Sequence, residues 1–228
     1  LAISRANMAN GMMRLSEEYL SVFYDHLHRK IYDFDVIGAD ETPVEVNKDG
    51  RPAGSKSYIW VYRSGGISST HHIVLYEYQK TRNASHPVRF LKDYEGICVT
   101  DGYQVHHSAE KTLEYVTIAG CWVHARRYFD EALKSIPQAV RSKSWGYLVM
   151  KQIQAIYREE GKLKDLKTEE RLKQRQLVIK PLVDALFAYA KQHQVPVGTQ
   201  GKLARAVTYL LNQEKYLRVF LENGEVPM

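Results

Sequence analysis

The stretch VIGADETPVEV, residues 36–46, reads as an apolar strand that carries a carboxylate pair, Asp40 and Glu41. A second stretch, GICVTDG, residues 96–102, is also a short apolar run, and it ends in Asp101 and a glycine. Buried strands are rich in Val and Ile and disfavour aspartate. One explanation for the two aspartates is that they meet and share a cation. The other is that each aspartate only ends its strand and bonds a turn, as Asp-Gly often does.

The elements expected around these stretches form a mixed sheet. Apolar residues at helical spacing predict one amphipathic helix from Met12 to Ile31, and Ser4 could cap a short helix before it. Alternating or apolar runs predict five strands, at residues 36–46, 58–62, 72–78, 96–101 and 115–119. Short turns join the first three, which favours an antiparallel meander. The fourth is reached through a short helix near Pro87, so a right-handed crossover makes it parallel to a neighbour.

The fold class that follows is α/β, with a mixed five-stranded sheet flanked by helices. In such a sheet the first and fourth strands can lie side by side, and Asp40 and Asp101 would then be neighbours. The rest of the chain reads as helices whose apolar stripes pack against one another. Within it, residues 158–175 are dense in charge and are expected to be solvated, and Pro181 is expected to kink a helix or to start a new one.

Composition restricts the class of protein. The 228 residues are 44% hydrophobic and 25% charged, as in a soluble globular protein. The net charge of +6 favours an anionic partner, of which nucleic acid is the commonest, although many basic proteins bind none. Cys98 and Cys121 lie in or beside apolar runs, which fits a reducing compartment better than a disulfide framework. No apolar run has the length of a membrane span, and the start at Leu1 is expected of a piece of a longer protein.

The paired aspartates indicate a chemistry. Two carboxylates a few ångströms apart repel each other unless a cation neutralises them. Hard oxygen ligands suit Mg²⁺ or Mn²⁺, and two such ions about 3.5–4 Å apart can activate an attacking oxygen and stabilise a leaving one. That is phosphodiester chemistry, and a basic protein suits a polyanionic substrate. Glu41 follows Asp40 directly and faces the other side of the strand, so we do not expect it to bind the same ion.

A third motif is Cys121-Trp122-Val123-His124. The Cys-x-x-His spacing is that of zinc ligands, but a zinc site needs four. No second close pair completes one, and the spare candidates are His106 and His107. We expect instead that Cys121 is a packed thiol and that His124 points toward the acidic site or satisfies a buried hydrogen bond.

Arg126 and Arg127 follow on the same predicted helix. Their expected role is a contact with phosphate or with a carboxylate. For Arg127 an ordinary solvated helix face explains the sequence equally well.

Taken together, these motifs resemble the transposases of the IS66 family of bacterial insertion sequences (the TnpC type). The residues that carry the resemblance are GADETPV at 38–44, YIWVYR at 58–63, TDGY at 100–103 and CWVHARRYF at 121–129. Their order and spacing are specific, and the resemblance covers almost the whole chain.

The resemblance implies an RNase H-like fold with a DDE catalytic triad, in which Asp40 and Asp101 are the first two acids and two Mg²⁺ (or Mn²⁺) ions are bound. The third acid of the family is a glutamate in an Asn-Asn-x-x-Glu-Arg motif, expected soon after Pro227 and absent here; Glu222 and Glu225 are poor substitutes. The chain is therefore expected to bind Mg²⁺ weakly and to cleave little or nothing.

The resemblance also implies a division of the chain and a set of partners. Residues 1–33 correspond to a helical lead-in at the end of a DNA-binding region, 34–136 to the catalytic core, and 137–228 to a helical insertion. The implied partners are the ends of the insertion sequence and target DNA, with homo-oligomers plausible, in the bacterial cytoplasm and away from membranes.

Two other functions remain open at this stage. A stand-alone RNase H-like nuclease would hydrolyse DNA without joining it, and its third carboxylate would have to lie within the chain. A non-catalytic DNA-binding or assembly module could keep a degenerate site without using it.

Overall fold

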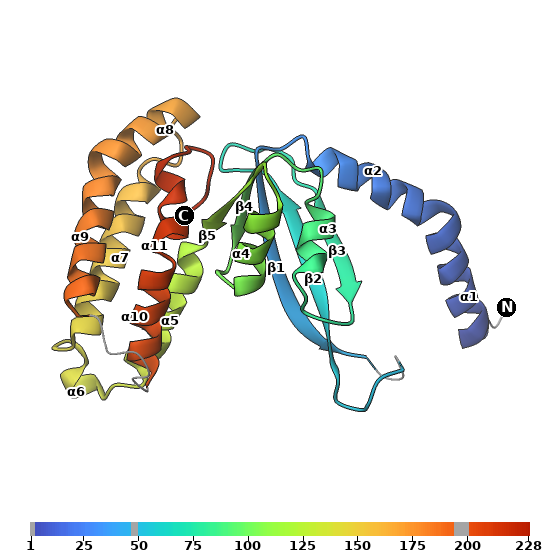
Figure 1. Ribbon diagram of the computed structural model, residues 1–228, viewed down its shortest axis with the longest axis horizontal. Helices are drawn as coiled ribbons and strands as arrows, with labels where there is room; N and C mark the ends of the chain where they lie inside the picture. Colours follow the sequence, from blue (N-terminus) through green and yellow to red (C-terminus); the bar gives the residue numbers. More distant parts are fainter. Residues whose placement is uncertain (1–2, 47–49, 194–200) are drawn as a thin grey trace.

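The computed structural model describes residues 3–46, 50–193 and 201–228, and the strands in these ranges form a five-stranded sheet in the order β3-β2-β1-β4-β5 (Figure 1). The strands are β1 (Val36–Glu45), β2 (Lys56–Ser64), β3 (Val74–Gln79), β4 (Gly96–Thr100) and β5 (Val116–Gly120). Strands β1, β2 and β3 form an antiparallel meander, whereas β4 is parallel to both β1 and β5. The predicted mixed sheet flanked by helices is confirmed, and its topology is consistent with an RNase H-like fold.

The helices account for most of the remaining chain. They are α1 (Arg5–Leu15), the π-helix η1 (Ser16–Leu20), α2 (Ser21–Ile31), α3 (Ser85–Phe90), α4 (Gln104–Thr112), α5 (Trp122–Lys134), α6 (Gln138–Arg141), α7 (Trp145–Gly161), α8 (Thr168–Gln174), the π-helix η2 (Arg175–Ile179), α9 (Lys180–Gln192), α10 (Lys202–Asn212), α11 (Glu214–Leu217) and the 3₁₀ helix η3 (Val219–Leu221). Within the described ranges, a helix with the length and apolar character of a membrane span is not found.

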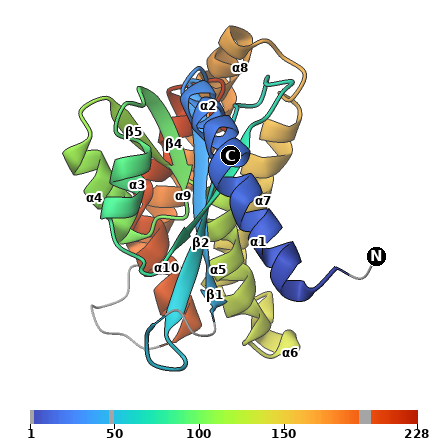
Figure 2. The same ribbon diagram turned by 90° about the vertical axis from the view of Figure 1, so that its right-hand side faces the viewer.

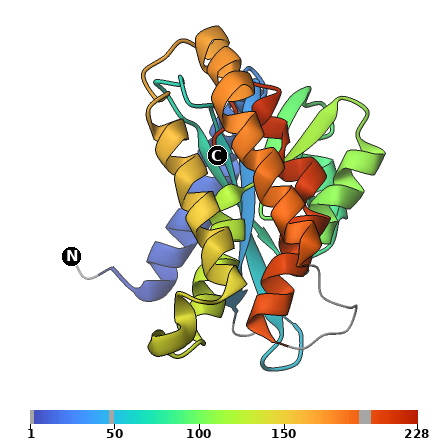
Figure 3. The ribbon, with the colours of Figure 1, turned by 90° about the vertical axis from the view of Figure 1, so that its left-hand side faces the viewer.

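Two apolar cores lie on the two faces of the sheet. Alternate residues of β1 point to opposite faces, so Ile37 enters one core and Val36 the other. The first core lies under α2, α3 and α4 and contains Trp60, Tyr62 and Phe90. The second extends from β5 and α5 into a layer formed by α7, α9 and α10 (Figure 3).

The short helix predicted after Ser4 is present, and the helix predicted from Met12 to Ile31 is divided among α1, η1 and α2. Helix α1 begins at Arg5, and the Ser4 hydroxyl caps it by accepting the Asn7 amide at 3.2 Å. The helix has no buried residue and leads away from the sheet (Figures 1 and 2). Contact with the first core begins only in α2, which ends at the buried Ile31.

Helix α4 was not predicted. It connects the parallel strands β4 and β5, and a parallel pair needs a crossover of this kind. The sequence carries a weak signal for it, because Val105, Ala109 and Leu113 recur four residues apart and all pack in the first core.

The prediction that residues 158–175 are solvated is wrong for two of its arginines. Arg171 is 2% exposed and Arg175 is fully buried. Their guanidinium groups donate to main-chain carbonyls of the segment 220–226 and so hold the end of the chain against α8 and η2. A guanidinium group can be buried where several carbonyls converge on its donors.

Candidate active site

Strands β1 and β4 bring Asp40 and Asp101 to the same place. The parallel register pairs Gly38 with Val99, so continuing it by two residues sets Asp40 opposite Asp101. Neighbouring strands lie about 4.8 Å apart. Both aspartates line one cavity of about 290 Å³, together with Cys121 and His124 from the β5–α5 junction.

The turn after β4 holds Asp101 firmly. Its Oδ1 accepts the Tyr103 amide at 2.9 Å, and its main-chain oxygen accepts the Tyr209 hydroxyl at 2.6 Å. Gly102, between Asp101 and Tyr103, has φ +82°, and a Cβ at this residue would come within 2.7 Å of the Gln213 side chain. A glycine is therefore needed at this position. Asp40 is more exposed, and its Oδ1 accepts the amide of Glu41 at 2.9 Å.

The Cys121 amide donates to the Thr100 carbonyl at 2.9 Å, which fixes the start of α5 beside β4. Burial raises the pKa of the Cys121 thiol, so it stays protonated at neutral pH. Burial, together with the positive charge of Arg127, lowers the pKa of His124, so its imidazole is neutral at pH 7. Within the described part of the chain the His124 Nδ1 has no hydrogen-bond partner.

The two spare candidates for zinc ligands, His106 and His107, lie apart from Cys121 and His124. His106 is fully buried on the opposite face of the sheet, and the His107 ring stacks on Tyr216 with centroids 4.0 Å apart. The two histidines of α4 therefore do not join Cys121 and His124 to form the four-ligand set that zinc requires.

Trp122 and the two arginines of the motif have separate environments. Trp122 is fully buried and donates from Nε1 to the Leu217 carbonyl at 2.8 Å, so it anchors α5 in the core and does not line the cavity. Arg126 and Arg127 are both exposed on α5. The Arg126 guanidinium lies 5.5 Å from the centre of the Tyr157 ring.

A second group of charged residues lies behind Asp101, and sequence reasoning missed it. Glu41 does face away from Asp40, and its side chain is 1% exposed. Arg82 donates from Nε to Glu41 Oε1 at 2.6 Å, and His106 Nε2 lies 3.3 Å from Glu41 Oε2. Burial alone would raise the pKa of Glu41, but the hydrogen bonds with His106 and Arg82 outweigh it and lower that pKa.

Asp101 reaches this group as well. Its Oδ2 lies 3.9 Å from an Arg82 nitrogen and its Oδ1 4.0 Å from His106 Nε2. Ligand atoms of Glu41, Asp101 and His106 fall within 4.8 Å of one another, so the three could hold a metal ion. In the present arrangement the Arg82 guanidinium already supplies the positive charge.

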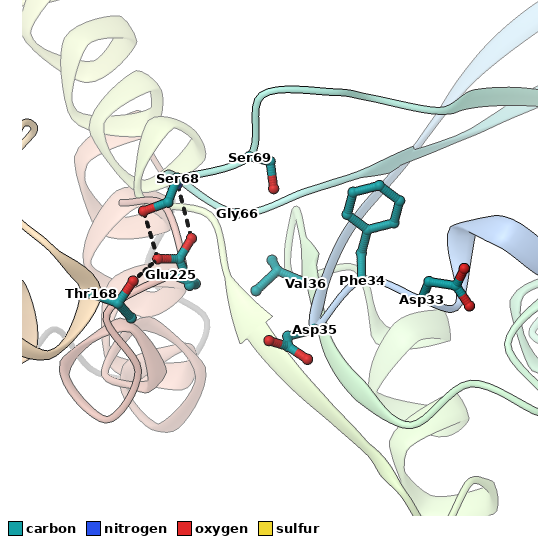
Figure 4. Close-up of a pocket in the computed structure, with 9 residues that line it drawn as sticks. All are labelled: Asp33, Phe34, Asp35, Val36, Gly66, Ser68, Ser69, Thr168 and Glu225. Atoms are coloured by element: carbon teal, nitrogen blue, oxygen red, sulfur yellow. Dashed lines mark hydrogen bonds between the residues drawn. The ribbon is translucent and has the colours of Figure 1, made fainter.

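Glu225 occupies a different site. It lines a cavity of about 410 Å³ beside the start of β1, with Asp35, Val36 and Gly66. Its carboxylate accepts the Ser68 amide and hydroxyl at 2.9 and 2.8 Å and the Thr168 hydroxyl (Figure 4). Asp40 lies in the middle of β1, so Glu225 does not share its cavity.

Asp40 on β1 and Asp101, directly after β4, line one cavity of an α/β fold, which makes this cavity a candidate active site. Compared with known families, the chain matches the one described as "Transposase IS66 family" over residues 1–228 and belongs to it. The resemblance stated from the motifs is thus confirmed.

Two similar curated proteins, both described as uncharacterized, are longer than this chain. The uncharacterized protein y4qI of Sinorhizobium fredii is 26% identical over 98% of the chain, and y4hP of the same species is 23% identical over 98%. The match covers 42% of each relative, so the chain spans about two fifths of their length.

Proposed function

We propose that this chain is the catalytic core of an IS66-family transposase that cuts and joins DNA strands with the help of divalent metal ions. Membership of the family supports transposition as the process. The observation that carries the catalytic part is that Asp40 on β1 and Asp101, directly after the neighbouring parallel strand β4, line a single cavity.

The donor set fits a hard cation. Carboxylate oxygens suit Mg²⁺ or Mn²⁺, whereas the half-buried Cys121 thiol keeps its proton and is a poor ligand. Asp40 and Asp101 would hold such ions. When bound, such ions activate an attacking oxygen and stabilise the leaving oxygen of a phosphodiester.

A third carboxylate is expected outside these residues. Glu225 already accepts hydrogen bonds from Ser68 and Thr168 and lines another cavity. Glu222 is exposed on the loop just before it. Both observations disfavour Glu222 and Glu225 as the third ligand, and we propose that the glutamate of the Asn-Asn-x-x-Glu-Arg motif of the family takes that role.

DNA is the proposed substrate. The net charge of +6 favours a polyanion. Arg126 and Arg127 are exposed on α5, the helix that also carries His124 into the cavity. We propose that they contact phosphates of the insertion-sequence end or of the target DNA.

The test is a calorimetric titration of the chain with Mn²⁺, beside Asp40→Ala and Asp101→Ala. We expect weak binding by the parent chain and a loss of about tenfold or more in each variant, since each removes a charged ligand. Glu222→Ala, which removes an exposed carboxylate, is the matched control and should bind as the parent does. Thermal unfolding of all three variants checks that they are folded. Mn²⁺ binding that neither aspartate variant changes would contradict the proposal.

A further inference from the structure

The Glu41–Arg82 ion pair is placed where an ordinary core would be apolar. Glu41 faces the first core from β1, directly across from the fully buried Trp60 on β2. Burying a carboxylate is costly, and a buried ion pair is often no more stable than an apolar pair of the same size. Stability alone therefore does not account for this pair, and its position beside Asp101 needs another explanation.

Glu41 uses both carboxylate oxygens. Oε1 accepts from Arg82 Nε and from a terminal nitrogen of the same guanidinium. Oε2 lies 3.3 Å from His106 Nε2, and His106 is fully buried against Trp60, with ring centroids 5.8 Å apart. The carboxylate is therefore fixed from two sides.

Arg82 is fixed less completely. Its side chain is 35% exposed, and its guanidinium lies 3.6 Å from the centre of the Tyr103 ring. The same terminal nitrogen that bonds Glu41 is 3.9 Å from Asp101 Oδ2, about one ångström beyond a hydrogen bond. A small rotation of the guanidinium would join Arg82 to Asp101.

We propose that Glu41 is a positioning residue that holds Arg82 away from Asp101 and so keeps the Asp101 carboxylate available for a metal ion. An arginine paired with Asp101 would compete with a divalent cation for the same oxygens. Glu41 binds the Arg82 guanidinium more closely than Asp101 does, and so it leaves the Asp101 oxygens without a direct hydrogen bond from Arg82. The inference rests on the function proposed above.

The decisive variants are Glu41→Gln and the double variant Glu41→Gln with Arg82→Gln. In the single variant Arg82 loses its charged partner, turns to Asp101, and weakens Mn²⁺ binding by about tenfold, as one hydrogen bond between charged groups can do. In the double variant the competitor is gone, and Mn²⁺ affinity returns to within about threefold of the parent chain. Glu45→Gln, which removes the same charge from the same face of β1, is the matched control and leaves binding unchanged.

A metal-free readout separates this inference from the proposed function. In a crystal structure of the Glu41→Gln chain, the 3.9 Å separation between Arg82 and Asp101 should fall to about 2.9 Å. An unchanged separation, or a double variant as weak as the single one, would overturn the inference alone. If the Asp40→Ala and Asp101→Ala chains bind Mn²⁺ as the parent does, it is the proposed function that fails.

Arg82→Gln by itself covers the case in which Glu41→Gln does not fold. If Arg82 is a restrained competitor, this variant binds Mn²⁺ at least as tightly as the parent chain. If Arg82 instead orients Asp101 for the metal, the variant binds more weakly, and that result would overturn the inference.

Discussion

At the scale of single residues, Glu225 shows that a carboxylate near a catalytic motif can be structural. Burial would raise its pKa, but hydrogen bonds from Thr168 and Ser68 outweigh that effect and hold the pKa below its ordinary value. The nearly buried Arg171 lies 3.4 Å from the same carboxylate. Glu225 therefore joins the Ser68 loop to the start of α8, and its charge stabilises the folded state.

The pH dependence of stability follows with a definite sign. Because the folded pKa of Glu225 is depressed, its contribution is present above about pH 4.5 and is lost as the pH falls through the folded value. Glu225→Gln should lower the free energy of unfolding at pH 7 by about 1–3 kcal/mol, and the gap to the parent chain should narrow below pH 4.5. Urea unfolding at several pH values measures this difference in the free energy of unfolding. Glu222→Gln, which changes an exposed side chain, is the control. A gap that stays constant with pH would contradict the assignment.

At the scale of elements, Arg175 holds the π-helical turn η2 to the last segment of the chain. Its nitrogens donate to the carbonyls of Phe220, Asn223 and Val226 at 2.8, 2.7 and 3.0 Å, and Nε lies 3.0 Å from a Glu160 carboxylate oxygen. The following helix α9 has Pro181 in its first turn. Proline has no amide hydrogen, so it cannot donate a hydrogen bond to the preceding turn. Helices α8, η2 and α9 follow one another without a break, so Pro181 lies at the change from the π-helical turn to the α-helix.

Replacement of Arg175 should therefore be costly. Arg175→Met leaves Glu160 without its partner and three carbonyls without donors, and we expect a loss of about 3–5 kcal/mol in the free energy of unfolding. Lys173→Met, on the exposed side of α8, should change stability by about 0.5 kcal/mol or less. Chemical denaturation of both variants gives the comparison. A loss below about 1 kcal/mol for Arg175→Met would show that water or other groups replace the guanidinium.

At the scale of the whole molecule, the helical region contacts the turn that carries Asp101. The Tyr209 hydroxyl on α10 donates to the Asp101 carbonyl, and the Gln213 amide donates to the Gly102 carbonyl at 3.3 Å. Burial raises the pKa of Tyr209, which keeps the hydroxyl protonated as a donor. Lys215 adds an ion pair to Glu110 on α4 at 3.0 Å.

We expect Tyr209→Phe to loosen this turn. The variant should lose about 1 kcal/mol of stability, the usual worth of one hydrogen bond, and should bind Mn²⁺ a few times more weakly. Tyr128→Phe is the matched control, because Tyr128 is exposed on α5 and its ring lies 4.5 Å from that of Tyr209. If both variants bind Mn²⁺ equally, the helical region does not contribute to the geometry of Asp101.

The boundary between a core at 34–136 and an insertion at 137–228 stays a prediction. One apolar core contains Val36 and Ala119 of the sheet together with Val149, Phe187 and Val207 of the helices. The helical region therefore packs directly on β5 and α5, and separate expression of residues 34–136 would expose that surface.

The strands and their order could be predicted from the amino-acid sequence, whereas the shared role of Asp40 and Asp101 stays a prediction. Apolar runs and turn residues are local signals, and the rules for crossovers and short turns leave few sheets that can contain them. The burial of Arg171 and Arg175, the contact between Glu41 and Arg82, and the separate site of Glu225 were decided only by the tertiary structure. Each depends on where side chains from distant segments meet, as when Ser68 and Glu225 bond across 157 positions of sequence. No local pattern records whether a charged side chain will find several carbonyls or a carboxylate in the folded chain, because its partners are placed only when the helices pack on the sheet.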